Sequence, residues 1–235
     1  MKRLGIIQPG KIGDIIICMP IAYYYFNKGY KVFWPIDKNI ISNFVGYCDY
    51  IEFIPIDNHC DVARQVCIKQ CSCNHIIDLS FTLPGSWDNF NTQYYKENEL
   101  VTKFDKIKFD IADVPFDEKW NLQINRNIAK EQSLYKQLNP NNEEYVILQW
   151  RGSDYYKKIE IQDIKHIKQI KIQSITNSIF DWTLLLEKAK AFVLIDSSVA
   201  NLVEQLKLPQ PKIFLARQHA RPTHKQHWKV IEYYD

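Results

Sequence analysis

The chain has 235 residues, of which 46% are apolar and 24% are charged. This balance excludes a globally disordered protein and allows one large domain or two small ones. The net charge of +3 is too small to demand a polyanionic partner, and with only 7 glycines the loops are expected to use Asn, Asp or Ser instead.

Predicted strands and helices alternate through the first half of the chain. Strands are expected at residues 4–8, 31–36, 50–54 and 75–79. Helices are expected at residues 15–27, 38–45 and 61–71. This alternation predicts an α/β domain with a parallel sheet and helical crossovers. The segment 80–125, rich in aromatic residues and Asn, predicts a mixture of helix and irregular structure.

The same alternation returns after a polar helix at 127–138 and a break at Asn139-Pro140-Asn141-Asn142. Strands are expected at 145–149, 170–173, 191–195 and 211–215, the last of these ending the sheet. Helices are expected at 159–166, 181–190 and 197–206, the second of them with Asp181 as its N-cap. We therefore predict a first domain at 1–125, a linker at 126–144 and a second domain at 145–235 with about four strands.

All six cysteines lie between Cys18 and Cys73. Three of them, Cys67, Cys71 and Cys73, lie close to His75 and look at first like a set of metal ligands. Their spacing fits no common zinc or iron–sulfur pattern. Because Cys67 and Cys71 share one face of a predicted helix, we expect them to pack as small apolar residues of the core, and we predict no metal site.

The expected location is the cytoplasm, either of a bacterium or of a virus-infected host cell. The first apolar run, Leu4–Ile7, is interrupted by Pro9 too early for a signal peptide. No apolar run reaches the roughly 18 residues that a membrane span needs. The cysteines are therefore expected to be reduced thiols.

A polar turn follows the first predicted strand, with the sequence Gln8-Pro9-Gly10-Lys11-Ile12-Gly13-Asp14. Ligands of open α/β sheets bind at the carboxyl edge of the strands, and Gly10 and Gly13 would let backbone amides approach one closely. Asp14 stands where the next helix should begin, so it is either a functional carboxylate or simply the N-cap of that helix. Lys11 is not followed by Ser or Thr, which excludes a Walker-type phosphate loop.

A second strand, turn and helix have the sequence Ile195-Asp196-Ser197-Ser198-Val199-Ala200-Asn201. The amides of Ser197 and Ser198 at a helix N-terminus would bind an anion, and Asp196 would accept hydrogen bonds from a ribose or a sugar. The alternative is a purely structural cap, in which Ser198 caps the helix and Asn201 lies in its first turn.

A third turn, Gln149-Trp150-Arg151-Gly152-Ser153-Asp154-Tyr155-Tyr156-Lys157-Lys158, follows the first strand of the second half. Its Arg151, Lys157 and Lys158 are placed to neutralise a diphosphate, and the alternative is a solvated loop. We expect the three turns to face one cleft between the two halves.

Between Gln205 and Ile231 the chain has six basic residues and no acidic ones. The basic residues are Lys207, Lys212, Arg217, Arg221, Lys225 and Lys229, and the same stretch holds His219, His224 and His227. Such a stretch either binds phosphates or forms a solvated basic tail.

Two of these motifs resemble the heptosyltransferase-like family, glycosyltransferase family nine. The segment Gly13-Asp14-Ile15-Ile16-Ile17-Cys18-Met19-Pro20 is similar to the family's opening of a Gly-Asp pair, apolar residues and Pro. Residues 180–198 are similar to its late block of a helix, a strand and an Asp-[Ser/Thr]-Gly turn, and residues 201–209 continue it. The order and spacing of the motifs together carry the resemblance.

The resemblance implies the GT-B architecture, an α/β fold of two Rossmann-like domains that face each other across a cleft. It implies Asp14 as the catalytic base, beside an acceptor-side loop of Gly10, Lys11 and Gly13. It assigns donor binding to Arg151, Lys157, Lys158, Asp196, Ser197, Ser198 and Asn201. The chain departs from the family at Ser198, where Gly is usual, at Asn201, where His is usual, and in being considerably shorter.

We therefore predict an inverting glycosyltransferase of hexosyl or heptosyl type, whose nucleotide-diphosphate sugar is a substrate and not a cofactor. The sequence has no carboxylate pair of the Asp-x-Asp kind, so a metal-independent reaction is expected. The expected acceptor is a hydroxyl group of a glycan. Two alternatives stay open: a viral enzyme acting on hydroxymethylated DNA bases, whose phosphates the basic stretch would contact, and a non-catalytic protein that binds a nucleotide or a glycan.

Overall fold

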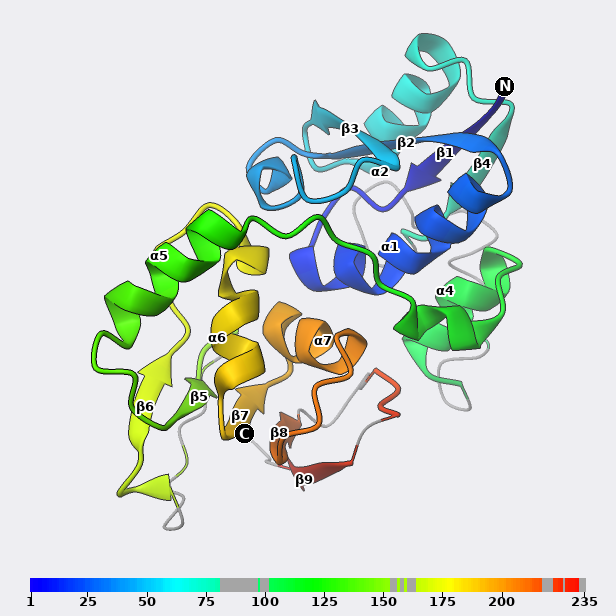
Figure 1. The fold of residues 1–235 in the computed structure, drawn as a ribbon. Helices are drawn as coiled ribbons and strands as arrows, with labels where there is room; N and C mark the ends of the chain where they lie inside the picture. The colour runs from blue at the N-terminus through cyan, green and yellow to red at the C-terminus, as the bar shows by residue number, and fades with distance from the viewer. Residues whose placement is uncertain are drawn as a thin grey trace. The chain divides into compact units, whose positions relative to one another are not determined.

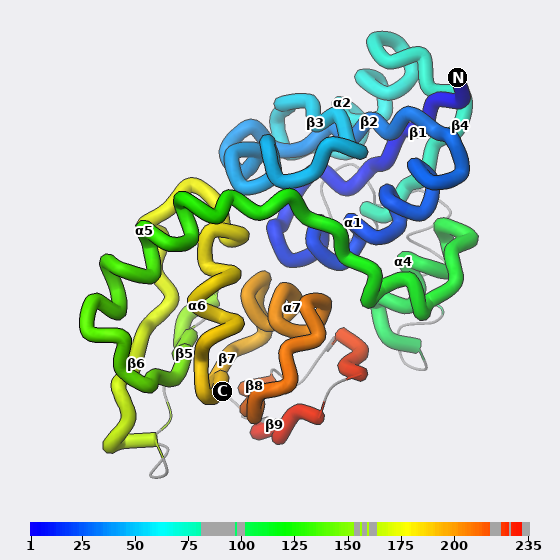
Figure 2. Tube along the Cα trace, viewed as in Figure 1, coloured from blue at the N-terminus to red at the C-terminus, as the bar shows by residue number. Residues whose placement is uncertain are grey.

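A computed structural model divides the chain into two compact units, Met1–Asn125 and Arg126–Asp235, shown as a ribbon in Figure 1 and as a trace in Figure 2. The structure describes residues 1–80, 97, 102–152, 156, 159, 164–216, 222–225 and 227–232. Both units are α/β with parallel sheets, as the alternation of strands and helices predicts. In the described ranges, no helix is both long and apolar enough to cross a membrane.

The described part of the first unit forms a four-stranded parallel sheet, in the order β3-β2-β1-β4. The strands are β1 (Lys2–Ile7), β2 (Tyr30–Asp37), β3 (Ile51–Ile56) and β4 (His75–Asp78). β1 lies between β2 and β4, and from Leu4 to Ile7 it is buried throughout. A continuous apolar run of this kind is typical of a parallel strand that is covered on both faces.

The helices of this unit lie on both faces of its sheet (Figure 1). They are α1 (Ile12–Asn27), the 3-10 turn η1 (Ile41–Asn43), α2 (Cys60–Gln65), the π-helical η2 (Val66–Gln70), α4 (Phe104–Ile111) and the 3-10 helix η3 (Phe116–Trp120). The prediction of a helix at 38–45 is wrong, because the segment forms only the short turn η1. The helix expected at 61–71 is present, but its second half widens into a π-helix.

The cysteines pack in the core, as expected. Cys67 and Cys71 are buried, and Cys71 packs beside Ile7 and Phe33. Gly5 of β1 leaves room for Cys67, since a Cβ atom at Gly5 would lie 2.7 Å from the Cys67 Sγ. No group of three or more His, Cys, Asp or Glu residues is placed to hold a metal ion anywhere in the described ranges.

The described part of the second unit forms a five-stranded parallel sheet, in the order β6-β5-β7-β8-β9. The strands are β5 (Tyr145–Gln149), β6 (Lys168–Lys171), β7 (Ala191–Ile195), β8 (Lys212–Ala216) and β9 (Trp228–Glu232). The expectation of about four strands ending with the one at 211–215 is wrong, since β9 pairs with β8 at the edge of the sheet. Trp228 anchors β9, because its indole N–H donates to Glu204 Oε2 at 2.7 Å.

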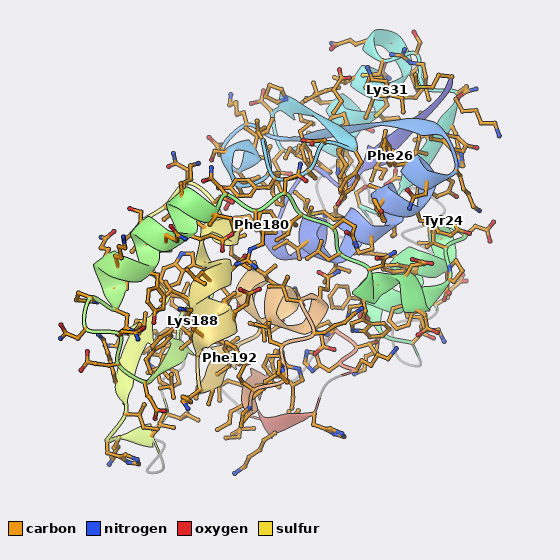
Figure 3. All side chains as sticks on the ribbon, viewed as in Figure 1. Tyr24, Phe26, Lys31, Phe180, Lys188 and Phe192 are labelled. Atoms are coloured by element: carbon orange, nitrogen blue, oxygen red, sulfur yellow. The ribbon has the colours of Figure 1, made fainter. Side chains whose placement is uncertain are left out.

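The helices of the second unit are α5 (Ile128–Leu138), η5 (Ile179–Trp182), α6 (Thr183–Lys188) and α7 (Ser198–Gln205). α5 lies in the segment expected to be a linker and belongs to the second unit. Asp181 is not an N-cap: the helix begins earlier, where Ser178 Oγ accepts from the Phe180 N–H, and Asp181 is buried inside η5. Figure 3 shows Phe180 and Phe192 within the second unit, both almost fully buried. The helix expected at 159–166 lies mostly outside the described residues.

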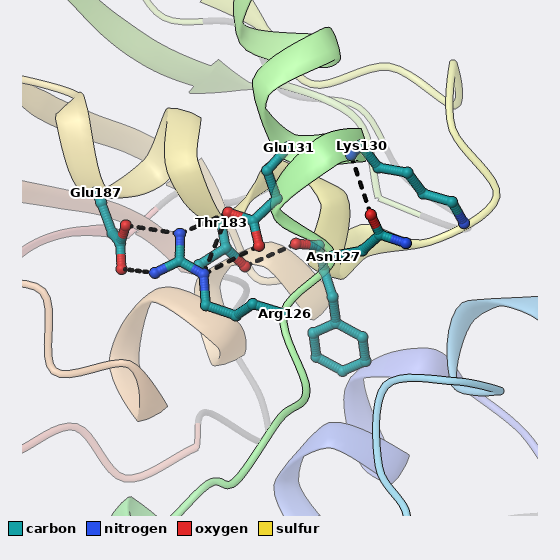
Figure 4. A network of polar contacts seen from close by, with 7 residues as sticks. Arg126, Asn127, Lys130, Glu131, Thr183 and Glu187 are labelled. Carbon is teal, nitrogen blue, oxygen red and sulfur yellow. Dashed lines mark hydrogen bonds and ion pairs between the residues drawn. The ribbon is translucent and has the colours of Figure 1, made fainter.

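Arg126 joins α5 to α6 through two carboxylates (Figure 4). Its guanidinium donates to Glu131 Oε2 at 2.5 Å and to Glu187 Oε1 at 2.7 Å. Only 1% of the Glu131 side chain is exposed, so this carboxylate depends on the arginine for its countercharge. The two carboxylates raise the pKa of Arg126, chiefly through the hydrogen bond that Arg126 donates to Glu131, although burial opposes them.

We predict that Arg126→Met lowers the free energy of unfolding of the second unit by about 1–3 kcal/mol, because it leaves the buried Glu131 carboxylate without its donor. Urea unfolding followed by circular dichroism measures the change. The matched control is Lys136→Met at an exposed position of the same helix. Equal stabilities of the two variants would contradict the prediction.

Candidate functional site

The first candidate site lies at the carboxyl end of β1, in the loop between this strand and α1. The Gln8 side chain folds back on the loop, and its Nε2 donates to the Gly10 carbonyl oxygen at 3.0 Å. The Asp37 N–H at the end of β2 donates to the Pro9 carbonyl oxygen at 2.7 Å. The loop is therefore fixed by hydrogen bonds both from within and from the neighbouring strand.

The backbone of this loop is strained at Lys11. Lys11 has φ 62° and ψ 108°, in a region that residues with a Cβ atom seldom adopt. Next to it, Gly10 is approached by Asn58, whose Oδ1 would lie 2.6 Å from a Cβ atom at Gly10. Lys11 is exposed and Gly13 is half-buried. Strain of this kind persists only where surrounding structure enforces it, and it gathers at functional sites.

Asp14 is the third residue of α1 and not its N-cap. The helix begins at Ile12 because Lys11 takes the cap position, without any side-chain hydrogen bond. The capping interpretation of Asp14 is therefore wrong. A carboxylate in the first turn is favoured by the helix dipole. The Asp14 side chain keeps 17% of its surface exposed, so the group remains accessible at the edge of the sheet.

A buried lysine lies beside this carboxylate. Lys108 on α4 has 2% of its side chain exposed, and its Nζ lies 3.8 Å from Asp14 Oδ1. The same ammonium donates to Gln8 Oε1 and to the Leu79 carbonyl oxygen, both at 2.7 Å. The sequence motifs did not single out Lys108. The sequence feature that could have pointed to Lys108 is its helical spacing, which places it on the same face of α4 as Phe104 and Ile111.

Two further charges are buried near Lys108. Asp105, one turn earlier on α4, is paired with Lys119 of η3, with Oδ2 2.5 Å from Nζ, and both side chains are almost fully enclosed. Cys18 follows Asp14 by one turn of α1, and burial raises the pKa of its thiol to about 12. At neutral pH the Cys18 thiol is therefore uncharged, which excludes it as a nucleophile here.

The second candidate site lies at the carboxyl ends of β5 and β7, which are neighbours in the second sheet. Ser197 Oγ donates to Gln149 Oε1 at 2.6 Å and accepts from the Ala200 N–H at 3.3 Å. Ser197 is thus the N-cap of α7, and the interpretation that gave this role to Ser198 is wrong. Ser198 is the first residue of the helix.

Three other expected donor-side residues of this unit, Arg151, Asp196 and Asn201, follow β5 or β7 within a few positions of the chain. The Arg151 side chain is exposed, and its carbonyl oxygen accepts from Gln149 Nε2 at 3.3 Å, so Gln149 connects the turn after β5 to the turn after β7. Asp196 is half-buried and Asn201 is buried in α7. Lys157 and Lys158 lie outside the described residues.

No protein-family model matches this sequence, and no curated protein matches it. Solved structures do resemble the model. The glycosyl transferase family 9 protein of Veillonella parvula has a TM-score of 0.66 at 11% identity, over 99% of this chain and 86% of that one. The ADP-heptose lps heptosyltransferase II of E. coli has a TM-score of 0.57 at 10% identity, over 99% and 90%. The E. coli heptosyltransferase WaaC with ADP-2-deoxy-2-fluoro heptose has a TM-score of 0.52 at 13% identity, over 97% and 92%.

The chain has the fold of glycosyltransferase family 9. The resemblance carried by the Gly13-Asp14 motif and by residues 180–209 is thereby confirmed at the level of the fold. The match runs along nearly the whole chain, through both units, although the short motifs cover only a part of it.

The basic residues after Gln205 are not all exposed, as phosphate binding by all six would require. Lys207, Lys225 and Lys229 are exposed, whereas Lys212 has only 4% of its surface exposed and donates to the Gln210 carbonyl oxygen at 2.9 Å. Burial lowers the pKa of Lys212, with Glu204 opposing the shift. The expectation of six basic residues facing phosphates is therefore wrong for Lys212. Arg217, Arg221 and His219 lie outside the described residues.

We predict that Ser197→Ala lowers the free energy of unfolding of the second unit by about 1 kcal/mol, because the helix loses its N-cap and β5 loses its connection to α7. Chemical denaturation measures the loss. Ser174→Ala, at an exposed loop position, is the control and is expected to stay within about 0.5 kcal/mol of the wild type. A Ser197→Ala variant as stable as this control contradicts the assigned cap.

Proposed function

We propose that this chain is an inverting glycosyltransferase that moves a sugar from a nucleotide-diphosphate donor to a hydroxyl acceptor. The observation that carries the proposal is the fold shared with glycosyltransferase family 9 along both units, with an accessible carboxylate, Asp14, at the carboxyl edge of the first sheet. Ligands of open parallel sheets bind at this edge.

In the proposed reaction, Asp14 acts as the general base. Its carboxylate accepts the proton of the acceptor hydroxyl while the hydroxyl oxygen forms a bond to the anomeric carbon. The bond from that carbon to the diphosphate oxygen breaks on the opposite face, and the diphosphate leaves with the electron pair. Attack from the opposite face inverts the anomeric centre.

The second unit is proposed to hold the donor. The N-terminus of α7 at Ser197 and Ser198 presents the positive end of a helix dipole, and the exposed Arg151 follows the neighbouring strand. Together with Lys157, Lys158, Asp196 and Asn201, these groups would bind the nucleotide and stabilise the charge that develops on the leaving diphosphate. Preorganised charge of this kind is commonly the largest contribution to catalysis. In this proposal no resident metal is required, and we expect activity to survive chelation.

The proposed acceptor is a glycan hydroxyl. The name of one structurally similar protein, the ADP-heptose lps heptosyltransferase II of E. coli, is consistent with that class of acceptor. The alternative acceptor, hydroxymethylated DNA, relies on the basic stretch, where Lys207, Lys225 and Lys229 are exposed. Each phosphate that is neutralised on duplex DNA steepens log K against log salt by about 0.9. Fluorescence anisotropy at several salt concentrations measures that slope, and no measurable affinity at low salt removes the DNA acceptor.

The decisive experiment is a binding and transfer screen of the full chain. Isothermal titration with ADP, UDP and GDP sugars finds the donor, and release of the nucleoside diphosphate in the presence of candidate glycans reports transfer. Binding of a nucleotide sugar with release of its diphosphate supports the proposal. Binding without any transfer would favour a non-catalytic binding protein, and no binding at all would overturn both.

We predict that Asp14→Asn lowers the turnover number by about 10²–10⁴-fold while donor affinity stays nearly unchanged, because the amide cannot accept the proton. Steady-state transfer rates and donor titration measure the two effects. Asp14 is not the cap of α1, but it lies 3.8 Å from the buried Lys108 ammonium, so circular dichroism is used to check that the variant folds. Asp110→Asn, an exposed carboxylate on α4, is the matched control. A fully active Asp14→Asn enzyme would exclude Asp14 as the base.

A further inference from the structure

The surroundings of the Lys108 ammonium suggest a role beyond packing. α4 carries this group into the interior of the first unit, where water cannot solvate it. A desolvated cation is costly unless it is paired and hydrogen-bonded. Among the described residues, Gln8 Oε1 and the Leu79 carbonyl oxygen accept from it at the carboxyl ends of β1 and β4. The Asp14 carboxylate forms an ion pair with it.

We infer that Lys108 is a positioning residue for the base, and this inference rests on the proposed function. The ammonium holds Asp14 Oδ1 toward the interior at 3.8 Å, while 17% of the side chain remains accessible to an acceptor. Because the same ammonium binds the ends of β1 and β4, it fixes the carboxylate relative to the edge of the sheet where substrates of such folds bind.

The neighbouring ion pair shows which described carboxylate lies beside Lys108. Asp105, one turn earlier on α4, is paired with Lys119 of η3, whereas Asp14 Oδ1 lies 3.8 Å from the Lys108 Nζ. The position of the base therefore depends on a side chain of α4, and a general base must be held within reach of the hydroxyl that it deprotonates.

The test is Lys108→Met, which keeps most of the length of the side chain and removes its charge. We expect the turnover number to fall by about 10–100-fold, since a misplaced catalytic group commonly costs that much. The donor KM should stay unchanged, because donor binding is assigned to the second unit.

Lys106→Met, which replaces an exposed lysine on the same helix, is the matched control and should keep the wild-type turnover number. Lys108→Gln is the second variant, since its amide still donates a hydrogen bond but carries no charge. It should lose turnover as Lys108→Met does, with a smaller loss of stability. If both Lys108 variants fail to fold while Lys106→Met folds, the lysine is only structural and the inference is overturned.

A measurement without turnover separates this inference from the proposed function. In protein with ¹³C-labelled aspartate carboxyl groups, the Asp14 resonance is assigned by its loss in Asp14→Asn, and its chemical shift at neutral pH is compared between wild type, Lys108→Met and Lys106→Met. A resonance that moves in Lys108→Met but not in Lys106→Met supports the contact of Lys108 with Asp14, even where every donor fails and the proposed function falls. Equal resonances in all three proteins, or a Lys108→Met enzyme with the wild-type turnover number, overturn the inference while leaving glycosyl transfer intact.

Discussion

The ammonium group of Lys108 organises the first unit, because a buried cation must find acceptors wherever the chain can supply them. It donates hydrogen bonds at the ends of two parallel strands and forms an ion pair with Asp14 in the first turn of α1, so one side chain contacts three segments at the edge of the sheet. The strained loop at Lys11 is held from one side by this ammonium, through Gln8, and from the other by β2. The position of Asp14 is thus a property of the whole unit and not of its short motif.

In the second unit, neutral groups connect the loops at the carboxyl edge of the sheet. Gln149 receives a hydrogen bond from the hydroxyl of Ser197 and donates to the turn at Arg151, so uncharged groups join the ends of two adjacent strands. Its ionic network lies elsewhere, around Arg126, where it joins two helices. In the proposed reaction, the neutral edge next to the N-terminus of α7 would hold the anionic donor, and the charged edge of the first unit would hold the hydroxyl that loses its proton.

Most strands of both sheets could be predicted from the sequence to within one or two residues, because buried parallel strands are short apolar runs between turns. β9 could not, since its residues lie in a basic, histidine-rich stretch and its anchor is a contact between Trp228 and the distant Glu204. Helix starts were misplaced at Asp14 and Asp181, where the local pattern favours an acidic cap but Lys11 and Ser178 take the cap positions. The candidate loops could be found from the sequence. Lys108 could not, because only the packing of α4 within the first unit places it beside Gln8 and Asp14.

The hydrogen bond between Lys108 and Gln8 spans 100 positions of the chain. During synthesis the Gln8–Asp14 turn leaves the ribosome long before its countercharge does, and domains generally complete their folding as units. β1, α1 and β2 can associate early, but the edge that carries Asp14 acquires its final geometry only once α4 and η3 have emerged. A chain interrupted ahead of α4 would therefore carry the Gly13-Asp14 motif without the cation that lies 3.8 Å from the Asp14 carboxylate in the folded unit.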